Sequence, residues 1–265
     1  MANLENNIFS ESFTLPSLGK CYEPNIDPVV TLRSMTTNDE MKRLSNSERQ
    51  YKVMCDVVDD CIMNNLGISS YDMILADYQF LVHKLRIVTY GSDYRMSSKC
   101  PYCGHTSEHI TDLDSFEVET YDEEKIAGLL EFTLPKTGHK IKLKLQTPRM
   151  LDDIQVRANE IMKKSHNKSG DRSLALTIEY LIASIDDEKV NPVTISQWVE
   201  TLPLQDANYI LRHAEKIAER VGLITEFNLR CDICGLTYTS NFRTTSEFFG
   251  PQIDIWWWVI RTTEI

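Results

Sequence analysis

The stretches CPYCG (Cys100–Gly104) and CDICG (Cys231–Gly235) decide how this chain is organised. Each is a Cys-x-x-Cys-Gly knuckle, a tight turn that brings two sulfur atoms together, and its glycine supplies the positive φ that such a turn usually needs. Zinc takes four ligands in a tetrahedron, so a knuckle with two ligands needs a partner, and the other knuckle is the obvious one. We therefore predict one structural zinc ion per chain, bound by four thiolates. These are Cys100, Cys103, Cys231 and Cys234.

Three other interpretations of the knuckles stay open. His105 or His109 could complete a first site beside the first knuckle, although Leu236 stands where His105 does in the second. The pairs could be disulfides or redox-active thiols, but neither knuckle opens a helix in a βαβ unit, where a thioredoxin-like pair lies. The cysteines could also bind nothing. Cys55 and Cys61 lie in a helical pattern, CDVVDDC, and are predicted to be small core residues.

Working outward from the knuckles, the chain repeats itself. FTLPSLGK (Phe13–Lys20) returns as FTLPKTGHK (Phe132–Lys140), and each copy precedes an extended stretch, an acidic helix start, further helices and a knuckle. The copies start 119 residues apart, at 13 and 132, and the knuckles 131 apart, at 100 and 231. The same order at nearly the same spacing indicates a duplication. Chance recurrence is the alternative, since each motif is short.

The predicted fold class is α+β, with two pseudo-repeated halves. Each half has short strands, a helical segment and a CxxC-bearing β-hairpin, and the halves join at a zinc-ribbon-like site. The predicted parts are an N-terminal tail, a first half with Cys100 and Cys103, a second half with Cys231 and Cys234, and a Trp-rich C-terminal tail. Their bounds are 1–12, 13–125, 126–250 and 251–265.

Several helices can be predicted within this plan. Thr37 and Glu40 fit a capping box at a helix start. Ile74, Tyr78, Leu81 and Leu85 recur at helical spacing, which predicts a helix over 70–85 with one buried face. In the second half, helices are predicted over 149–164, 174–185, 195–201 and 204–221.

Composition excludes several classes of function. The chain has 265 residues, of which 42% are apolar, and a formal charge of −11. A surface of that sign repels phosphate backbones and anionic lipids, so broad nucleic-acid or membrane binding is disfavoured. The start of the chain lacks the pattern of a signal peptide, no apolar run is long enough to span a membrane, and seven cysteines do not suit a secreted disulfide framework. We expect an intracellular protein.

Signatures of catalysis are missing from the sequence. It has no Gly-rich phosphate loop, no G-x-S-x-G and no H-E-x-x-H, and its six histidines do not cluster. The acidic runs Asp59-Asp60, Asp152-Asp153 and Asp186-Asp187-Glu188 are interpreted as solvated helix faces or ends. A zinc ion with four protein ligands leaves no position open for substrate. We predict that the chain is not an enzyme.

The C-terminal region is unusually aromatic, with Phe248 and Phe249 followed by IDIWWWVIRTTEI. Tryptophan is enriched at interface hot spots, so we interpret these side chains as anchors for a partner protein. The alternative is a buried strand or a tail folded onto its own domain. The predicted partner-binding residues are Trp256, Trp257, Trp258, Phe248 and Phe249.

The first half resembles the T-even-type phage baseplate hub and hub-assembly proteins. The resemblance rests on the run Leu15–Lys20 (LPSLGK), a following strand with a basic residue, Arg33, and an acidic helix start, Asp39-Glu40, and it covers about residues 13–154. It implies a structural or chaperone-like late protein that binds other tail proteins and can form an oligomer within the baseplate. The zinc ion predicted from the knuckles would stabilise such a protein. The resemblance also implies a location in the host cytoplasm during assembly, and then in the virion tail. The Trp-rich tail has no counterpart in the resemblance.

A second function class competes with this one. A zinc-ribbon regulatory module that binds nucleic acid or a transcription partner would need a basic, aromatic-bearing stripe near the knuckles. The candidate basic residues are Arg95, Lys99, Arg230 and Arg243. The net charge of −11 disfavours this alternative.

Overall fold

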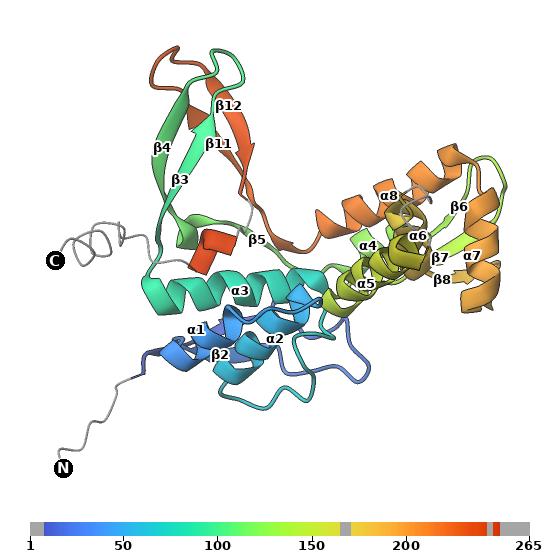
Figure 1. The fold of residues 1–265 in the computed structure, drawn as a ribbon, viewed down its shortest axis with the longest axis horizontal. Coiled ribbons are helices and arrows are strands. Elements are labelled where there is room, and N and C mark those ends of the chain that lie inside the picture. Colours follow the sequence, from blue (N-terminus) through green and yellow to red (C-terminus); the bar gives the residue numbers. More distant parts are fainter. Residues whose placement is uncertain (1–7, 165–170, 243–245, 250–265) are drawn as a thin grey trace.

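The computed structural model describes residues 8–164, 171–242 and 246–249. It has an α+β fold with two lobes and a projecting arm (Figure 1). The first lobe contains β1 (Ser10–Thr14), β2 (Val29–Arg33), α1 (Thr37–Arg43), α2 (Gln50–Cys61) and α3 (Leu75–Tyr90). The second contains α4 (Glu123–Leu130), β6 (Glu131–Thr133), β7 (Lys140–Leu143), α5 (Pro148–Lys164), α6 (Ser173–Leu181), β8 (Ile182–Ile185), β9 (Glu188–Lys189), α7 (Pro192–Thr201) and α8 (Leu204–Ala218).

The arm consists of two antiparallel hairpins that rise together from α3 in Figure 1. Its strands are β3 (Asp93–Lys99), β4 (Thr106–Asp112), β11 (Glu226–Arg230) and β12 (Thr237–Asn241). Short elements connect the arm to the lobes: η1 (Leu113–Ser115), β5 (Val118–Glu119), β10 (Gly222–Leu223) and η2 (Ser246–Phe249). One hairpin follows the first lobe in sequence and the other follows the second, so the arm joins the two halves of the chain.

Helix α3 is the centre of the molecule. The predicted face, from Ile74 to Leu85, is buried, and so are Phe80, His83 and Arg86 on other sides of the helix. This follows from its position between the first-lobe helices and the root of the arm (Figure 1). A helix that is covered on several sides has apolar residues over most of its surface and not only along one narrow stripe.

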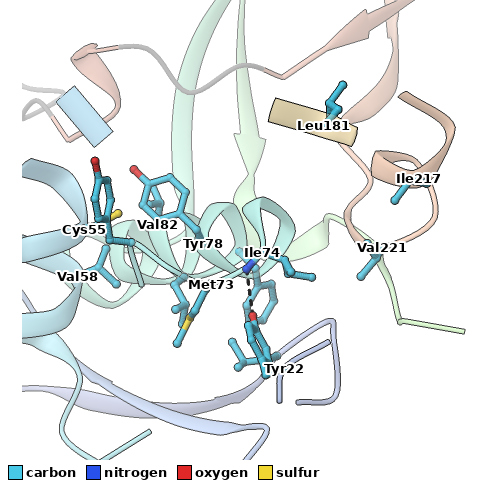
Figure 2. Packing of buried hydrophobic residues seen from close by; sticks show 14 of the residues in the cluster. Tyr22, Cys55, Val58, Met73, Ile74, Tyr78, Val82, Leu181, Ile217 and Val221 are labelled. Carbon is cyan, nitrogen blue, oxygen red and sulfur yellow. Dashed lines mark hydrogen bonds between the residues drawn. The ribbon is translucent and has the colours of Figure 1, made fainter. Parts of the chain in front are cut away.

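The core continues from α3 into the second lobe. Figure 2 shows Leu181, Ile217 and Val221 of the second lobe beyond Ile74, and all four belong to one hydrophobic cluster. On the first-lobe side, the amide of Ile74 donates a hydrogen bond to Tyr22 Oη at 3.3 Å. Burial of apolar surface therefore holds the lobes together as well as each lobe.

Polar contacts join α2 and α5 across the two lobes. Asp152 of α5 is 2% exposed, and its carboxylate accepts hydrogen bonds from the amides of Tyr51 (3.1 Å) and Lys52 (2.8 Å) at the start of α2. Arg49, the N-cap of α2, makes no side-chain cap itself and pairs with Asp153 at 2.6 Å. The prediction that Asp152-Asp153 is a solvated run is therefore wrong for Asp152, which caps a helix of the other lobe.

The strand pairs that open the two halves have the same register. Phe13 lies opposite Val30, and Phe132 lies opposite Ile141. Val30 lies six residues before Thr36, the N-cap of α1. Ile141 lies six residues before Thr147, whose hydroxyl accepts a hydrogen bond from the amide of Met150, three residues later.

The turn after each FTLP strand is also held in the same way. Asp77 accepts a hydrogen bond from the Ser17 amide at 2.9 Å, and Asp206 accepts one from the Lys136 amide at 2.9 Å. Each aspartate is the third residue of its helix, α3 or α8. The ring contacts agree too. Phe13 meets Phe80 of α3 edge to face, and Phe132 meets Tyr209 of α8.

Several predicted boundaries are wrong. The capping box of α1 is formed by Thr36 and Asp39, one residue before the predicted Thr37 and Glu40. Asp39 rather than Glu40 forms the capping box because Arg33 of β2 pairs with Asp39 at 2.7 Å and holds its carboxylate in place. The helix predicted over 174–185 ends at Leu181, since 182–185 form strand β8, which pairs with β7.

Candidate metal centre

The two knuckles meet at the tip of the arm (Figure 1). Each hairpin turn has the same hydrogen bonds. Gly104 donates its amide to the Cys100 carbonyl at 2.9 Å, and Gly235 donates to the Cys231 carbonyl at 2.9 Å. Both glycines have positive φ, 74° and 70°, as the sequence pattern predicts. A side chain is strained in this conformation, which is why glycine follows each second cysteine.

The four predicted cysteines come together, with all four Sγ atoms within 4.8 Å of one another. Across the hairpins, Cys100 Sγ lies 3.8 Å from Cys234 Sγ, and Cys103 Sγ lies 3.6 Å from Cys231 Sγ. A disulfide needs about 2.05 Å, so these thiols are free. With Zn–S bonds of about 2.3 Å, a tetrahedron places its sulfurs about 3.8 Å apart. The donor set and the spacing both fit a tetrathiolate metal site.

Burial differs within each knuckle. The first cysteines, Cys100 and Cys231, are each 1% exposed, while the second ones, Cys103 and Cys234, are exposed. Tyr238 packs beside the buried pair, and its hydroxyl donates a hydrogen bond to Ser98 Oγ of the other hairpin at 3.2 Å. The site therefore sits at the end of the arm, closed from inside by the hairpins and open toward solvent.

Local hydrogen bonds favour ionisation at one position. The amide of Cys234, and then that of Ile233, hydrogen-bonds the Cys231 sulfur and lowers the pKa of this thiol to about 6. At Cys103 a similar bond from the His105 amide is outweighed by partial desolvation of the sulfur and by hydrogen bonds with the three neighbouring thiols, which together raise the pKa of Cys103 to about 12. Four thiols this close cannot all ionise without a cation. A divalent ion would replace their protons and bind all four sulfurs at once.

The structure does not bring His105 or His109 to the first knuckle as a third ligand. Within the described residues, the group that could hold a metal contains the four cysteines and neither His105 nor His109. His109 lies in β4, and its Nε2 is buried with no hydrogen-bond partner. Cys55 and Cys61 are fully buried in the first-lobe core, as predicted, and burial raises the pKa of each to about 12.

An aromatic cluster roots the arm on α3. Tyr94 of β3 meets Phe242, next to β12, at 5.6 Å between ring centroids, and Phe248 packs against both. His83 of α3 packs against Phe248 as well, and its Nε2 lies 2.7 Å from the Leu113 carbonyl. Burial lowers the pKa of His83, so the ring is neutral at pH 7 and donates this hydrogen bond. Both hairpins are thus fixed at the root as well as at the tip.

The predicted aromatic anchors fall into two groups. Phe248 and Phe249 are 1% and 4% exposed and pack in the core of the chain itself. Arg86, which is also buried, donates from Nε to the Phe248 carbonyl at 2.8 Å and holds this segment on α3. Trp256, Trp257 and Trp258 lie outside the described residues.

The outward faces of the arm carry both signs of charge. Arg95 and Lys99 lie on β3 and Arg230 lies on β11, and acidic residues lie on these strands and on β4. These acidic residues are Asp93, Glu108, Asp112 and Glu226. The described strands of the arm therefore carry charges of both signs rather than basic residues alone, and Arg243, the fourth candidate basic residue, lies outside the described residues.

Within the residues that the structure describes, no helix has the length and apolar character needed to cross a membrane. Comparison with curated proteins gives no match, and comparison with solved structures gives none either. The family model described as T4 bacteriophage base plate protein matches residues 8–250, which include both lobes and the whole arm. The chain therefore belongs to the T4 bacteriophage base plate protein family.

Proposed function

We propose that this chain is a structural or assembly protein of the baseplate hub in a contractile phage tail. It acts by binding other tail proteins rather than by catalysis, and one zinc ion stabilises it. Membership of the base plate family supports the setting. The observation that carries the zinc is the convergence of Cys100, Cys103, Cys231 and Cys234 from two distant hairpins at the tip of one arm.

The donor set supports zinc as the bound metal. Soft thiolates favour zinc over magnesium or calcium, and four protein ligands are the mark of a structural site. Cys100 and Cys103 would supply two ligands from the first half, and Cys231 and Cys234 two from the second. The ion would neutralise charge at the tip and link hairpins whose sequences are 131 residues apart. With no coordination position left open, it would supply no catalysis.

The duplication is part of this proposal. Its support is the equal register of the opening strands, the equal threonine caps, and the aspartate that holds the turn after each FTLP strand. The equal hydrogen bonds of the knuckles add to it. Two related halves that meet at one metal ion would form a rigid arm. In the baseplate, such an arm would hold neighbouring proteins at a fixed distance from each other.

The proposed contact with a neighbour is the Trp-rich tail, 251–265. The family model ends its match at residue 250, so this tail lies beyond the part that the family shares. Phe248 and Phe249 belong to the core, so Trp256–Trp258 are the proposed anchors. Each tryptophan buries about 150–250 Å², so three can contribute on the order of 10 kcal/mol before ordering is counted.

The test is the composition of particles and of assembly intermediates made with a chain truncated after Pro251. Mass spectrometry should find the full chain in hub intermediates formed in the host cytoplasm. Its presence in mature particles as well identifies a built-in part, and its loss from them identifies a chaperone. The truncated chain should fold normally, with unchanged thermal unfolding, and be missing from both.

Two results would contradict the proposal. If the full chain is in neither intermediates nor particles, the hub assignment is wrong. If the truncated chain loses thermal stability but still joins the complex, the tail is core and another surface binds the partner. The nucleic-acid alternative would be favoured by salt-dependent binding of the full chain to duplex or single-stranded DNA.

A further inference from the structure

The residue before each first cysteine is basic. Lys99 precedes Cys100 at the end of β3, and Arg230 precedes Cys231 at the end of β11. Their recurrence at the same place in both knuckles is a signal that the sequence already contains.

Both basic side chains turn back over their own knuckle. A Cβ built on Gly104 would lie 3.9 Å from Cε of Lys99, and one built on Gly235 would lie 3.8 Å from Nη2 of Arg230. Arg230 also donates from Nε to the Gly235 carbonyl at 3.2 Å. Each basic side chain thus lies beside the glycine that follows the second cysteine of its knuckle, and the backbone joins its residue directly to the first cysteine.

Charge gives this placement a consequence. A divalent ion with four thiolates has a net charge of −2, and the first cysteine of each knuckle is 1% exposed. Asp232 adds a further negative charge inside the second knuckle, in a chain whose net charge is already −11. A partly desolvated anionic cluster in such a chain is stabilised by cations held beside it.

We propose that Lys99 and Arg230 are positioning residues of the metal site, which neutralise its thiolates and slow the loss of the ion. This inference rests on the proposed zinc site. Two hairpins from different halves of the chain place a cation over the same part of the same turn, which ordinary solvated surface charges have no reason to do. Arg230 also fixes the turn through its hydrogen bond, whereas Lys99 acts through charge alone.

The experiment measures zinc release from the purified full chain to an excess of a chelating dye. Lys99→Gln and Arg230→Gln should each release zinc about tenfold faster, the lower end of what outer-shell partners contribute to metal sites. The double variant should multiply the two effects. Lys99→Arg and Arg230→Lys keep the charge and should restore most of the slow release.

A matched control is Lys189→Gln, which removes the same charge from the exposed strand β9 in the second lobe. It should release zinc at the rate of the natural chain. Raising the salt concentration should shrink the effect of Lys99→Gln, because the Debye length falls from about 10 Å at 0.1 M to about 3 Å at 1 M. The metal-free forms of the natural chain and of Lys99→Gln should unfold at the same temperature.

Three outcomes overturn the inference. Equal release rates for Lys99→Gln and Lys189→Gln at low salt would show that the cation does not act on the site. If Lys99→Arg releases zinc as fast as Lys99→Gln, the shape of the lysine side chain and not its charge slows the loss of the ion. If the natural chain holds no zinc, the zinc proposal itself fails, which is visible before any variant is made.

Discussion

Asp39 shows how one residue joins a strand to the helix that follows it. The carboxylate is 1% exposed, pairs with Arg33 of β2 at 2.7 Å and accepts the Thr36 amide at 2.7 Å. Burial opposes its ionisation, but the hydrogen bonds from Arg33 and Thr36 outweigh burial and lower its pKa to about 2. The basic strand residue and acidic helix start of the family resemblance are thus one ion pair.

Replacing Asp39 by Asn should destabilise the protein by about 2 kcal/mol, from the difference between its ordinary pKa and the folded one. Because the folded pKa is lowered, this stabilisation is fully present above about pH 4 and is lost as the pH falls toward 2. Denaturant unfolding of the natural chain and of Asp39→Asn, at pH 7 and at about pH 3, checks this prediction. The difference between their free energies of unfolding should be smaller at about pH 3.

Asp60→Asn is the control for Asp39→Asn. Asp60 pairs with Lys42 on the surface, where both side chains are well exposed. An exposed pair contributes about 0–1 kcal/mol, so this variant should stay close to the natural chain. An Asp39→Asn loss no larger than that of the control would contradict the role given to the buried pair.

The sequence predicted the cysteines but not the other polar contacts, and the reason is physical. A metal site needs particular atoms, and CxxCG marks them locally. Asp152 has no local signature, because its partners lie about 100 residues earlier, on α2. The same holds for Arg86, whose guanidinium binds the Phe248 carbonyl 162 residues away.

Among the elements, helices were predicted better than their ends. The periodic face of α3 identified its buried side chains, although the helix runs over Leu75–Tyr90 rather than 70–85. Residues 182–185 read as the end of a helix, because an apolar run does not distinguish a buried strand from a buried helix. These residues form a strand because they pair with β7, and that pairing joins residues far apart in the sequence.

Helix α2 depends on a residue of the other lobe. Since Arg49 provides no cap, the first amides of α2 are satisfied by Asp152 of α5. Asp152→Ala should cost about 1–2 kcal/mol, the usual effect of losing a helix cap. Amide hydrogen exchange should speed up at Tyr51 and Lys52 first, with the rest of α2 following.

Asp153→Ala is the matched control, because it removes the neighbouring carboxylate. Asp153 is part of a more exposed pair with Arg49, and its loss should cost less than about 1 kcal/mol. If the two variants lose equal stability, or if exchange at Tyr51 is unchanged in Asp152→Ala, capping across the lobes is not what holds α2.

At the scale of the molecule, three of the contacts between the two halves of the chain lie at different distances from the knuckles. The core runs from α3 to α8, polar contacts connect α2 with α5, and the cysteines meet at the tip of the arm. The first two lie in the body and the third lies at the far end of the hairpins (Figure 1). Loss of the third should therefore loosen the arm and leave the lobes together.

The purified chain should contain one zinc ion by elemental analysis, and Cys231→Ser should contain less than one. Structural zinc contributes roughly 10–16 kcal/mol in zinc-finger peptides, and here the affected part is the arm. Amide exchange should therefore rise in β3, β4, β11 and β12, while α3 and α8 stay protected.

Cys21→Ala tests whether the loss is specific to the knuckles. Cys21 is not one of the four clustered cysteines, so this variant should keep one zinc and a protected arm. A stoichiometry of two would mean that each knuckle binds its own ion with other ligands. A stoichiometry of zero with a protected arm would mean that the aromatic root and the Tyr238–Ser98 contact hold the hairpins without metal. Exchange that rises equally in the arm and in α3 of Cys231→Ser would show that the arm and the body unfold as one unit.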